Sequence, residues 1–350
     1  MISEIPDVVM KDGEVVAVDL ETYDPDLKKH GSGAILGKGF VVGVALAYGD
    51  KKFYFPLNHE EDTTGYPANY VWRHLNKKIF QNEKVTKVFH NAMYDVCWIR
   101  AVTKKMVKGP IVDTMIAASV IDENRMRYSL DSLAKDYKIG SKNKYDLEKK
   151  ANLTLKLWNI VEKSIKTPVK TESKNKKTLE NIFNLETSLF PCLVDMRFKG
   201  VRIDEKKAET LGKDLKKRKE RIVRGIKKRT GMAVEIWAAS SVQKLLDQQN
   251  IKDYKKTPKS GRASLSKDYL ESHSNIYLRL IARARQYDKL INVFVDGILK
   301  FVHKGRIHAE INQIRSERGG TVTGRFSMRN PNLQQIPGKG KYGNIIRSLF

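Results

Sequence analysis

The fold of this chain is decided near its start, by the stretch Val15-Val-Ala-Val-Asp19-Leu-Glu21. An apolar run rich in valine is typical of a buried strand. Residues i and i+2 of a strand project from the same face, so we expect the carboxylates of Asp19 and Glu21 to lie side by side at the carboxyl end of this strand. An Asp-x-Glu pair is also typical of a strand end exposed to water. The neighbouring sequence has to decide whether these two carboxylates form a functional site or simply a solvated strand end.

The sequence that follows this strand alternates between strand and helix patterns. Short apolar runs bounded by glycine and charge predict strands at 41–47, 53–55 and 87–89. Apolar residues at helical spacing predict helices at 69–80, 93–101, 114–121 and 130–137. Strands followed by interleaved helices predict one α/β domain with a mixed central sheet.

A third acid follows the predicted strand at 87–89, in the segment His90-Asn91-Ala-Met-Tyr94-Asp95. Two carboxylates that lie close together repel each other unless a cation lies between them. At the ends of neighbouring strands, Asp19, Glu21 and Asp95 would offer the hard oxygen ligands that Mg²⁺ or Mn²⁺ prefers. Metals held in this way assist the hydrolysis of phosphodiesters. Imidazole is not a preferred ligand of magnesium, so His90 is expected to be structural.

The charge of the chain favours nucleic acid as its partner. The 350 residues include 66 Lys and Arg against 40 Asp and Glu, a formal net charge of +26. Such an excess favours a polyanion, with an anionic membrane surface as the second choice. No apolar stretch is long enough to cross a bilayer, the first residues lack a signal-peptide pattern, and Cys97 and Cys192 cannot form a disulfide framework. These observations predict a cytoplasmic protein without a membrane partner.

Beyond the α/β region the chain becomes basic and helical. Residues 163–177 hold six lysines and one acid, a composition typical of a solvated linker, with a loop that contacts nucleic acid as the alternative. Helices are expected at 178–198 and 204–230, the second with Asp204 as its N-cap and Gly231 after its end. The second helix has one apolar face, and its other faces carry lysine and arginine, which favours contact with a duplex backbone.

Four segments of the first region resemble the 3′–5′ exonuclease domain of family A DNA polymerases. They are Val18-Asp19-Leu-Glu21-Thr22, Phe89-His90-Asn91-x-x-Tyr94-Asp95, Asp113-Thr-Met-Ile-Ala-Ala118 and Tyr128-Ser-Leu-Asp131-Ser-Leu-Ala134. The resemblance implies a ribonuclease H-like fold, with a mixed central sheet flanked by helices. It also implies that Asp19, Glu21 and Asp95 are catalytic and bind Mg²⁺ or Mn²⁺, and that Asp113 is mainly structural.

The fourth acid of the family's site is where this chain departs from the pattern. The family carries Tyr-x-x-x-Asp just before a helix that reads Thr-Leu-x-Leu-Trp. That helix is present as Leu153-Thr-Leu-Lys-Leu-Trp158, but Asp146 and Lys150 stand at the two preceding positions, and the adjacent Tyr145 and Asp146 would face different sides of a helix. The cation of Lys150 would repel an incoming metal ion. We therefore expect a site that binds one metal or binds poorly, with exonuclease activity reduced or lost.

The second region resembles the thumb and the start of the palm of the same polymerases. The matching segments, in the family's order, are Met196-Arg-Phe-Lys-Gly-Val-Arg-Ile-Asp204, Ser240-Ser-Val-Gln-Lys-Leu-Leu246, Thr257-Pro-Lys-Ser-Gly-Arg-Ala-Ser264, Asp288-Lys-Leu290 and Thr323-Gly-Arg-Phe-Ser-Met-Arg-Asn-Pro-Asn-Leu-Gln-Gln-Ile-Pro337. The resemblance implies that a primer–template duplex is held by Arg325, Asn332, Gln334, Lys289, Arg329 and Thr323. Arginine can reach acceptors that nearly every base pair presents in the minor groove, so Arg325 would test pairing geometry without reading sequence.

The resemblance predicts an exonuclease-like domain at 1–165, a basic linker at 166–178, a helical thumb at 179–300 and the start of an α+β palm at 301–350. The palm aspartates and the fingers helix of the family would lie beyond Phe350, so we expect no polymerisation by this chain alone. The main hypothesis is the N-terminal part of a phage-type DNA polymerase acting in replication, naturally split into two polypeptides, with a truncated product as the alternative. It would bind a primer–template and a single-stranded 3′ end, and a second polypeptide would supply nucleotidyl transfer. The alternatives are a catalytically inert DNA-binding scaffold subunit and a ribonuclease, although a ribonuclease leaves 323–337 unexplained.

Overall fold

The computed structural model describes residues 6–57, 67–141, 147–169, 177–258, 261, 263–315 and 319–350. The chain forms two compact units. The first comprises Met1–Gly200 together with His308–Gln334, and the second comprises Val201–Ile307 together with Gln335–Phe350.

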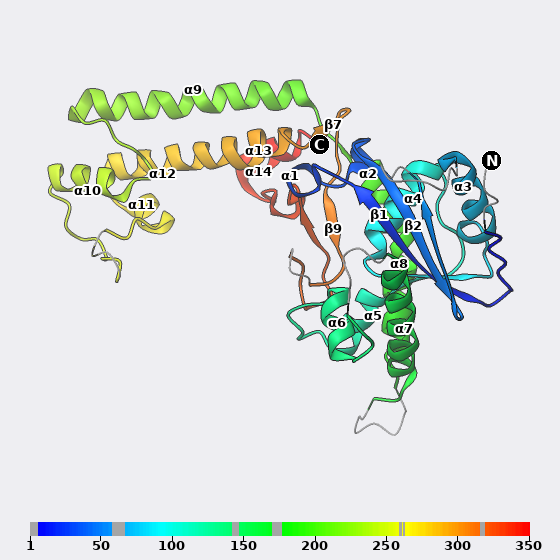
Figure 1. Cartoon of the computed structure of the whole chain (residues 1–350). Helices are drawn as coiled ribbons and strands as arrows, with labels where there is room; N and C mark the ends of the chain where they lie inside the picture. Colours follow the sequence, from blue (N-terminus) through cyan, green and yellow to red (C-terminus); the bar gives the residue numbers. More distant parts are fainter. Residues whose placement is uncertain are drawn as a thin grey trace. The chain divides into compact units, whose positions relative to one another are not determined.

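The first unit is built on a five-stranded mixed sheet in the order β3-β2-β1-β4-β5 (Figure 1). The strands are β1 (Val15–Tyr23), β2 (Phe40–Tyr48), β3 (Lys51–Pro56), β4 (Thr86–Phe89) and β5 (Ile111–Asp113). β2 is antiparallel to β1 and β3, whereas β4 is parallel to β1 and β5. The predicted strands are confirmed, and β5 is an addition whose three residues are too few to show a period.

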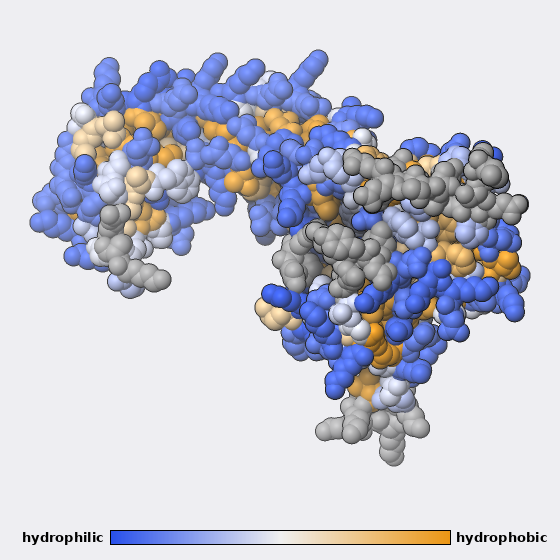
Figure 2. Space-filling view, in the orientation of Figure 1, coloured by the Kyte–Doolittle hydropathy of each residue, from blue (hydrophilic) through white to orange (hydrophobic). Residues whose placement is uncertain are grey.

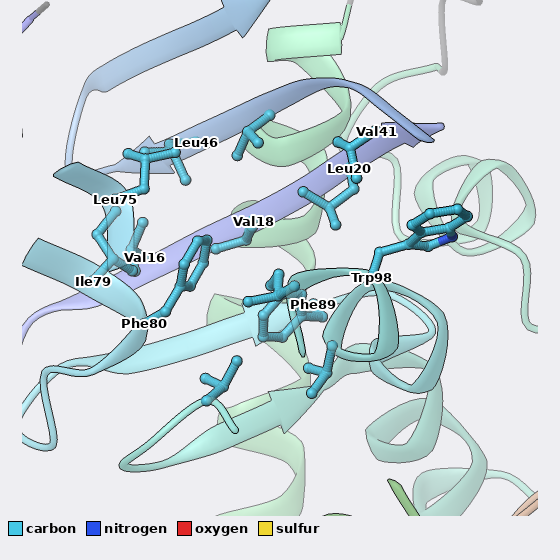
Figure 3. Close-up of a cluster of buried hydrophobic side chains, with 14 of the residues drawn as sticks. Val16, Val18, Leu20, Val41, Leu46, Leu75, Ile79, Phe80, Phe89 and Trp98 are labelled. Carbon is cyan, nitrogen blue, oxygen red and sulfur yellow. The ribbon is translucent and has the colours of Figure 1, made fainter. Parts of the chain in front are cut away.

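The residues of β1 alternate between two cores. Val16, Val18 and Leu20 belong to one core, on the face where Phe80 and Phe89 also pack (Figure 3). Ala17 belongs to a second core, which it shares with Ala45 and Ala47 of β2 and with residues of helix α7 (Leu147–Lys166). Small side chains let a helix lie close to a sheet, and α7 packs directly on β1 and β2. Because strand residues alternate, Asp19 and Glu21 share the face of Ala17.

The predicted helices of the first unit are present at the expected positions. The helices of this unit are α1 (Leu27–His30), α2 (Gly33–Leu36), α3 (Ala68–Leu75), α4 (Ala92–Thr103), α5 (Thr114–Ile121), α6 (Leu130–Asp136), α7 (Leu147–Lys166) and α8 (Glu180–Lys199), and the π-helical turn η1 (Asn76–Phe80) continues α3. The one-turn helices α1 and α2 were not predicted. The strands β9 (Glu310–Asn312) and β10 (Ser327–Arg329) form a separate antiparallel pair in the same unit.

The predicted basic linker lies between α7 and α8. The backbone N–H of Val169 donates to the carbonyl of Lys177 at 2.8 Å, and the N–H of Leu179 donates to the carbonyl of Ile165 at 3.1 Å. These bonds hold the two ends of the linker together, while 170–176 lie outside the described residues. Helix α8 packs with the first unit. The functional boundary at 178 remains a prediction.

The second unit is mainly helical (Figure 1). Its helices are α9 (Glu205–Thr230), α10 (Ala239–Gln248), α11 (Lys267–Ser272), α12 (Ile276–Lys289), α13 (Asp296–Leu299) and α14 (Gly340–Arg347), with the π-helical turn η2 (Leu290–Val295) after α12. Three short strands, β6 (Val201–Arg202), β8 (Arg306–Ile307) and β7 (Val302–His303), form an antiparallel sheet.

Helix α9 begins and ends at the predicted residues. Asp204 is its N-cap, and the Asp204 Oδ1 atom accepts the N–H of Lys207 at 2.9 Å. Gly231 ends it in the left-handed conformation at φ 73°, which glycine adopts without steric cost. The helix packs along α12 and η2, and a Cβ at Gly212 would lie 3.1 Å from the Cγ1 atom of Val295. Gly212 therefore allows the close approach of these two segments.

Among the described residues, none of the helices combines the length and the apolar composition needed to cross a bilayer.

The two cysteines differ in their exposure. Cys97 is buried and Cys192 is exposed, and both are free thiols. Burial raises the pKa of the Cys97 thiol, although the cations of Arg197 and Arg100 act in the opposite direction.

Candidate functional site: a carboxylate-lined cavity and a cationic helix

The strand β1 delivers Asp19 and Glu21 to the same face of the sheet. Asp19 pairs in register with Ala45 of β2, and Glu21 pairs with Gly43. Neither neighbour has a long side chain, so these positions of β2 do not crowd the two carboxylates. The register then shifts between Glu21 and Thr22, and such an irregularity redirects the residues that follow it.

Asp95 reaches the same region from the first turn of α4. Its side chain is buried, with 5% of its surface exposed, and it accepts the backbone N–H of Leu20. Burial, followed by the charges of Asp19 and Asp113, raises the pKa of Asp95 well above its usual range. The structure therefore brings Asp19 and Asp95 close enough for their charges to interact, as the sequence predicted.

Asp113 holds the turn that positions Asp95. Its Oδ1 atom accepts the N–H groups of Asn91 at 3.0 Å and Met115 at 2.8 Å, and its Oδ2 atom accepts the N–H of Ala92 at 2.8 Å. The same carboxylate is the N-cap of α5. Asn91 is in the left-handed region at φ 69° directly before α4. This geometry gives Asp113 a structural task, in agreement with the expectation from the resemblance.

Sequence reasoning did not assign a site role to Tyr94, which organises the neighbouring loop. The Tyr94 hydroxyl donates to the Oδ2 atom of Asp24 at 3.2 Å. The Thr22 hydroxyl lies 2.5 Å from the Tyr94 hydroxyl and acts as the donor, because the proton of Tyr94 is already used. Burial raises the pKa of Tyr94 to about 12, so it keeps its proton at neutral pH. Its position next to Asp95 in the motif was the available signal.

Sequence reasoning also missed Tyr54, which reaches Glu21 from β3. The Tyr54 hydroxyl donates to the Oε2 atom of Glu21 at 3.4 Å. The ring crosses β2 over Gly43, where a Cβ would lie 2.2 Å from the Tyr54 hydroxyl oxygen. Alternation along β3 could have placed Tyr54 on the face of α7. The pairing register, which puts Tyr54 opposite Ala45 and lets its ring reach over Gly43 to Glu21, is not visible in the sequence.

Lys150 occupies the start of α7, close to this site. Its side chain is half-buried, and its positive charge lowers the pKa of Asp95, although burial of Asp95 is the larger effect. The positive charge of Lys150 therefore lies close enough to Asp95 to affect its pKa, as expected from the sequence. Tyr145 and Asp146, the residues weighed as replacements for the missing acid, lie outside the described residues.

A divalent metal needs several oxygen ligands around one point. Within the described part of the chain, no group of three or more Asp, Glu, His or Cys side chains is placed to hold a metal ion. Asp19 and Asp95 lie near each other, Glu21 is bonded by Tyr54, and Lys150 adds a positive charge. The described residues therefore do not form a complete site for the predicted Mg²⁺ or Mn²⁺.

A cavity of about 440 Å³ opens beside Asp19. Its lining comes from the loop after β4, from α5 and α6, from α8, and from the β9–β10 pair. The polar residues that line it are Asp19, His90, Asn91, Tyr94, Asp113, Tyr128, Ser129, Arg197, Glu310, Asn312, Gln313 and Arg329. The cavity thus contains several groups able to bind a polar ligand next to the carboxylates.

The predicted DNA-binding residues near 323–334 belong to the first unit. Thr323 and Arg325 are exposed. Arg329 forms an ion pair with the buried carboxylate of Glu310. The amide of Gln334 accepts the N–H of Met328 at 3.2 Å and donates to the carbonyl of Phe326 at 3.0 Å. Arg325 is therefore the most accessible cation of this segment, whereas the Gln334 amide already supports the loop.

The predicted contact Asn332 also has a local partner. Its Oδ1 atom accepts the N–H of Gln334 at 3.1 Å. Lys289, the remaining predicted contact, lies at the end of α12 in the second unit, where it is exposed. Asn332 thus shapes a turn, and Lys289 presents its charge to the surface of the helical unit.

Helix α9 carries a stripe of cations on the side opposite its packed face. Its buried residues are Ala208, Gly212, Leu215 and Ile226. At 3.6 residues per turn, the opposite side holds Lys213, Lys217, Arg221, Arg224 and Lys228. These five residues, here called the α9 stripe, are exposed and form no ion pair with any described residue. Figure 2 shows the hydrophilic surface along this helix.

Comparison with known proteins assigns the family. Residues 4–161 match the family model described as "3'-5' exonuclease", and residues 205–350 match "DNA polymerase family A". The chain belongs to the family A DNA polymerases. The two matches follow each other in the order of an N-terminal portion of such an enzyme, as the resemblance had implied.

Relatives of this family extend over most of the chain. It is 25% identical to a "DNA-directed DNA polymerase" of Pseudomonas phage M6, over an alignment that covers 96% of this chain and 54% of the relative. It is 28% identical to "DNA polymerase DpoZ" of Acinetobacter phage SH-Ab 15497, over 89% of this chain and 55% of the relative. The chain thus spans about half the length of these curated phage relatives.

A solved structure has the same fold. It is the "POL domain of Pol1 from M. smegmatis complex with DNA primer-template and dNTP", with a TM-score of 0.72 and 21% identity, over 96% of this chain and 54% of that chain. The predicted fold class is confirmed: a ribonuclease H-like exonuclease fold with a mixed sheet, followed by a helical thumb.

Proposed function

We propose that this part of a family A polymerase holds primed DNA during replication, while polymerase residues on a second polypeptide join the nucleotides. The observation that carries the proposal is the α9 stripe, whose five exposed cations form no ion pair with any described residue. Cations arranged along a helix neutralise phosphates and give binding that depends on salt but not on sequence.

The exposed residues Arg325 and Lys289 complement the stripe in this proposal. Arg325, together with Thr323, would contact the minor groove, and Lys289 would contact a phosphate. Arg329, Asn332 and Gln334 would act mainly by shaping the segment that presents Arg325, because their side chains have partners within the chain. Replacing Arg325 with Ala should weaken duplex binding about 5- to 50-fold in a fluorescence anisotropy titration. Unchanged binding would contradict this assignment.

The need for a second polypeptide is tested by reconstitution. This chain should not extend a primer alone, and extension should appear when a polypeptide carrying the family's palm and fingers is added. Primer extension by the isolated chain would contradict the proposal. The coding sequence directly downstream of residue 350 is a second test, because a separate reading frame supports a two-chain enzyme and continuous coding refutes it.

We further propose that the exonuclease site is degenerate and digests DNA weakly or not at all, so that the first unit acts as a DNA-binding scaffold. This second function is favoured by the effect of the Lys150 charge on Asp95 and by the incomplete set of metal ligands among the described residues. Asp19, Glu21 and Asp95 would then bind Mg²⁺ or Mn²⁺ through one weak site.

A charge reversal at Lys150 tests the degenerate site. Lys150→Asp should raise Mg²⁺-dependent digestion of single-stranded DNA about 10- to 100-fold, because a carboxylate replaces the repelling cation. Lys156→Asp is the matched control, since Lys156 lies on the exposed side of the same helix. Vigorous digestion by the unmodified protein that Asp19→Ala abolishes would show instead that the site is complete and active.

A further inference from the structure

A buried arginine lines the cavity beside Asp19 and has few partners. Arg197 is 6% exposed and stands in the last turn of α8. Its Nε atom is buried and has no hydrogen-bond partner among the described residues. Its Nη1 atom lies 4.0 Å from the Sγ atom of Cys97, and a thiol is a weak acceptor. The guanidinium therefore has at least one donor that no described residue satisfies, in a residue that lines the cavity.

No described carboxylate lies within ion-pair distance of Arg197. Asp195, the acid nearest to it along α8, is paired with Arg100. The carbonyl groups at the end of α8 give the guanidinium partial compensation, because the carboxyl end of a helix is the negative end of its dipole. A buried cation without a paired anion is costly, so the site favours an anionic ligand.

Three acids line the same cavity, and two of them are already satisfied. Glu310 is held by Arg329 and by the Nδ2 atom of Asn330 at 3.1 Å. Asp113 accepts three backbone N–H groups. Asp19 is the third acid, and it belongs to the carboxylate site on β1. An anion at Arg197 would therefore meet a cation, two carboxylates that have partners within the chain, and Asp19, whose negative charge would oppose the binding.

The rest of the lining leaves the binding of an anion mainly to Arg197. The side-chain amide of Asn312 donates to the Ser327 hydroxyl at 3.3 Å, and that of Gln313 donates to Glu186 at 3.0 Å, so both already have partners within the chain. A volume of about 440 Å³ is in the range of small-ligand pockets and can hold a nucleotide unit. Arginine is also the side chain whose donors match two phosphate oxygens at once.

We propose that Arg197 forms a phosphate-binding subsite in this cavity, which takes a phosphate of nucleic acid. The source is either a phosphodiester of a single strand or the terminal phosphate of a nucleoside monophosphate. Anion binding follows from the buried guanidinium alone, whereas its assignment to nucleic acid rests on the proposed function. Anion binding and the assignment of the anion to nucleic acid therefore need separate measurements.

The first measurement is a thermal unfolding series with inorganic phosphate in the presence of EDTA. Phosphate should raise the Tm of the full chain by about 3–6 °C at a hundredfold excess over its Kd. Arg197→Met should lose this response and, without phosphate, unfold at the same or a higher temperature, because an uncompensated charge has been removed. Arg197→Lys should keep part of the response. Arg73→Met, which removes an exposed arginine of α3, should behave as the unmodified protein.

The outcomes separate an anion site from a structural arginine. If Arg197→Met unfolds at a clearly lower temperature and still responds fully to phosphate, the subsite is refuted. If Arg197→Met does not fold, the charge-retaining Arg197→Lys decides, because a full response would show that the guanidinium is not required.

A second series with deoxyadenosine monophosphate and a decadeoxythymidylate, again with EDTA, identifies the source. A stronger response to the monophosphate assigns a terminal phosphate, and a stronger response to the oligonucleotide assigns a phosphodiester. A response to inorganic phosphate that needs Arg197, with none to either nucleic-acid probe, overturns the nucleic-acid assignment. Failure of duplex binding by Arg325→Ala concerns the other proposal and leaves this result unaffected.

Discussion

The carboxylates of the first unit and the cations of α9 use charge in opposite ways. Asp113 is buried, and its carboxylate oxygens accept three backbone N–H groups. The α9 stripe is exposed, and its members form no ion pair with any described residue. The partners of a charge therefore decide its task. The Asp113 carboxylate, which has partners within the chain, is committed to the fold, and the exposed cations without an ion pair among the described residues are available to a ligand.

The largest effect is expected at Asp113. Asp113→Ala should lower the free energy of unfolding of the first unit by about 3 kcal/mol, because buried N–H groups lose their acceptor and α5 loses its N-cap. Chemical denaturation measures the change. Asp50→Ala, at the exposed turn between β2 and β3, is the control and should change stability by less than about 0.5 kcal/mol. Equal effects at the two positions would remove the contrast between buried and exposed acids.

The next effect concerns binding and not stability. Replacing Lys217, Arg221 and Arg224 with Gln should weaken duplex binding about 10- to 100-fold and lower the salt slope by about 3, with little change in unfolding. The matched control replaces Lys216, Arg218 and Lys219 with Gln, which removes the same net charge from ion-paired positions. A similar loss in both triple variants would show that net charge, and not the stripe, governs binding.

Lys87 extends the comparison to a buried cation. Its amine donates to the carbonyls of Asn82 at 2.5 Å, Val85 at 2.7 Å and Lys108. Burial lowers the pKa of Lys87 to about 8, below the unfolded value of about 10.4. The unfolded chain therefore binds more protons between these values, and the free energy of unfolding should rise with pH through this window by about 1–2 kcal/mol.

Denaturation at pH 7.5 and pH 10 measures this rise against Lys87→Met, in which it should be absent. The exposed Lys105→Met is the control and should keep it. Parallel pH curves for Lys87→Met and the unmodified chain would contradict a lowered pKa at Lys87.

The smallest effect is expected for an exposed ion pair on α9. Arg218 donates to the Oδ2 atom of Asp214 at 2.8 Å, and both side chains are about half exposed. A double-mutant cycle with Arg218→Ala and Asp214→Ala should give a coupling energy below about 0.5 kcal/mol, because water screens the pair. A coupling above about 1.5 kcal/mol would show that exposed charges of this helix also serve the fold.

Much of the fold could be predicted because it follows from local periodicity. The apolar run before Asp19 predicted β1, and the spacing of Asp204 and Gly231 predicted both ends of α9. The position of β9 and β10 in the first unit was not predicted, since these short strands have no period of their own and their place depends on long-range packing.

The candidate site could be predicted only in part. The motifs identified Asp19, Glu21 and Asp95, and the role of Asp113 agrees with the geometry. The contact of Tyr54 with Glu21 depends on strand register, which a single sequence does not specify. The burial of Arg197 was missed because an arginine near the end of a helix is usually solvated.

The contrast between Cys97 and Cys192 has a practical consequence. A maleimide dye reacts with a thiolate, so the exposed Cys192 on α8 should be labelled while the buried Cys97, with its raised pKa, is spared. The native chain therefore offers a single attachment point for a fluorophore, about one and a half turns from the cavity arginine on the same helix. Single-molecule spectroscopy of this polymerase portion can begin without any engineered cysteine.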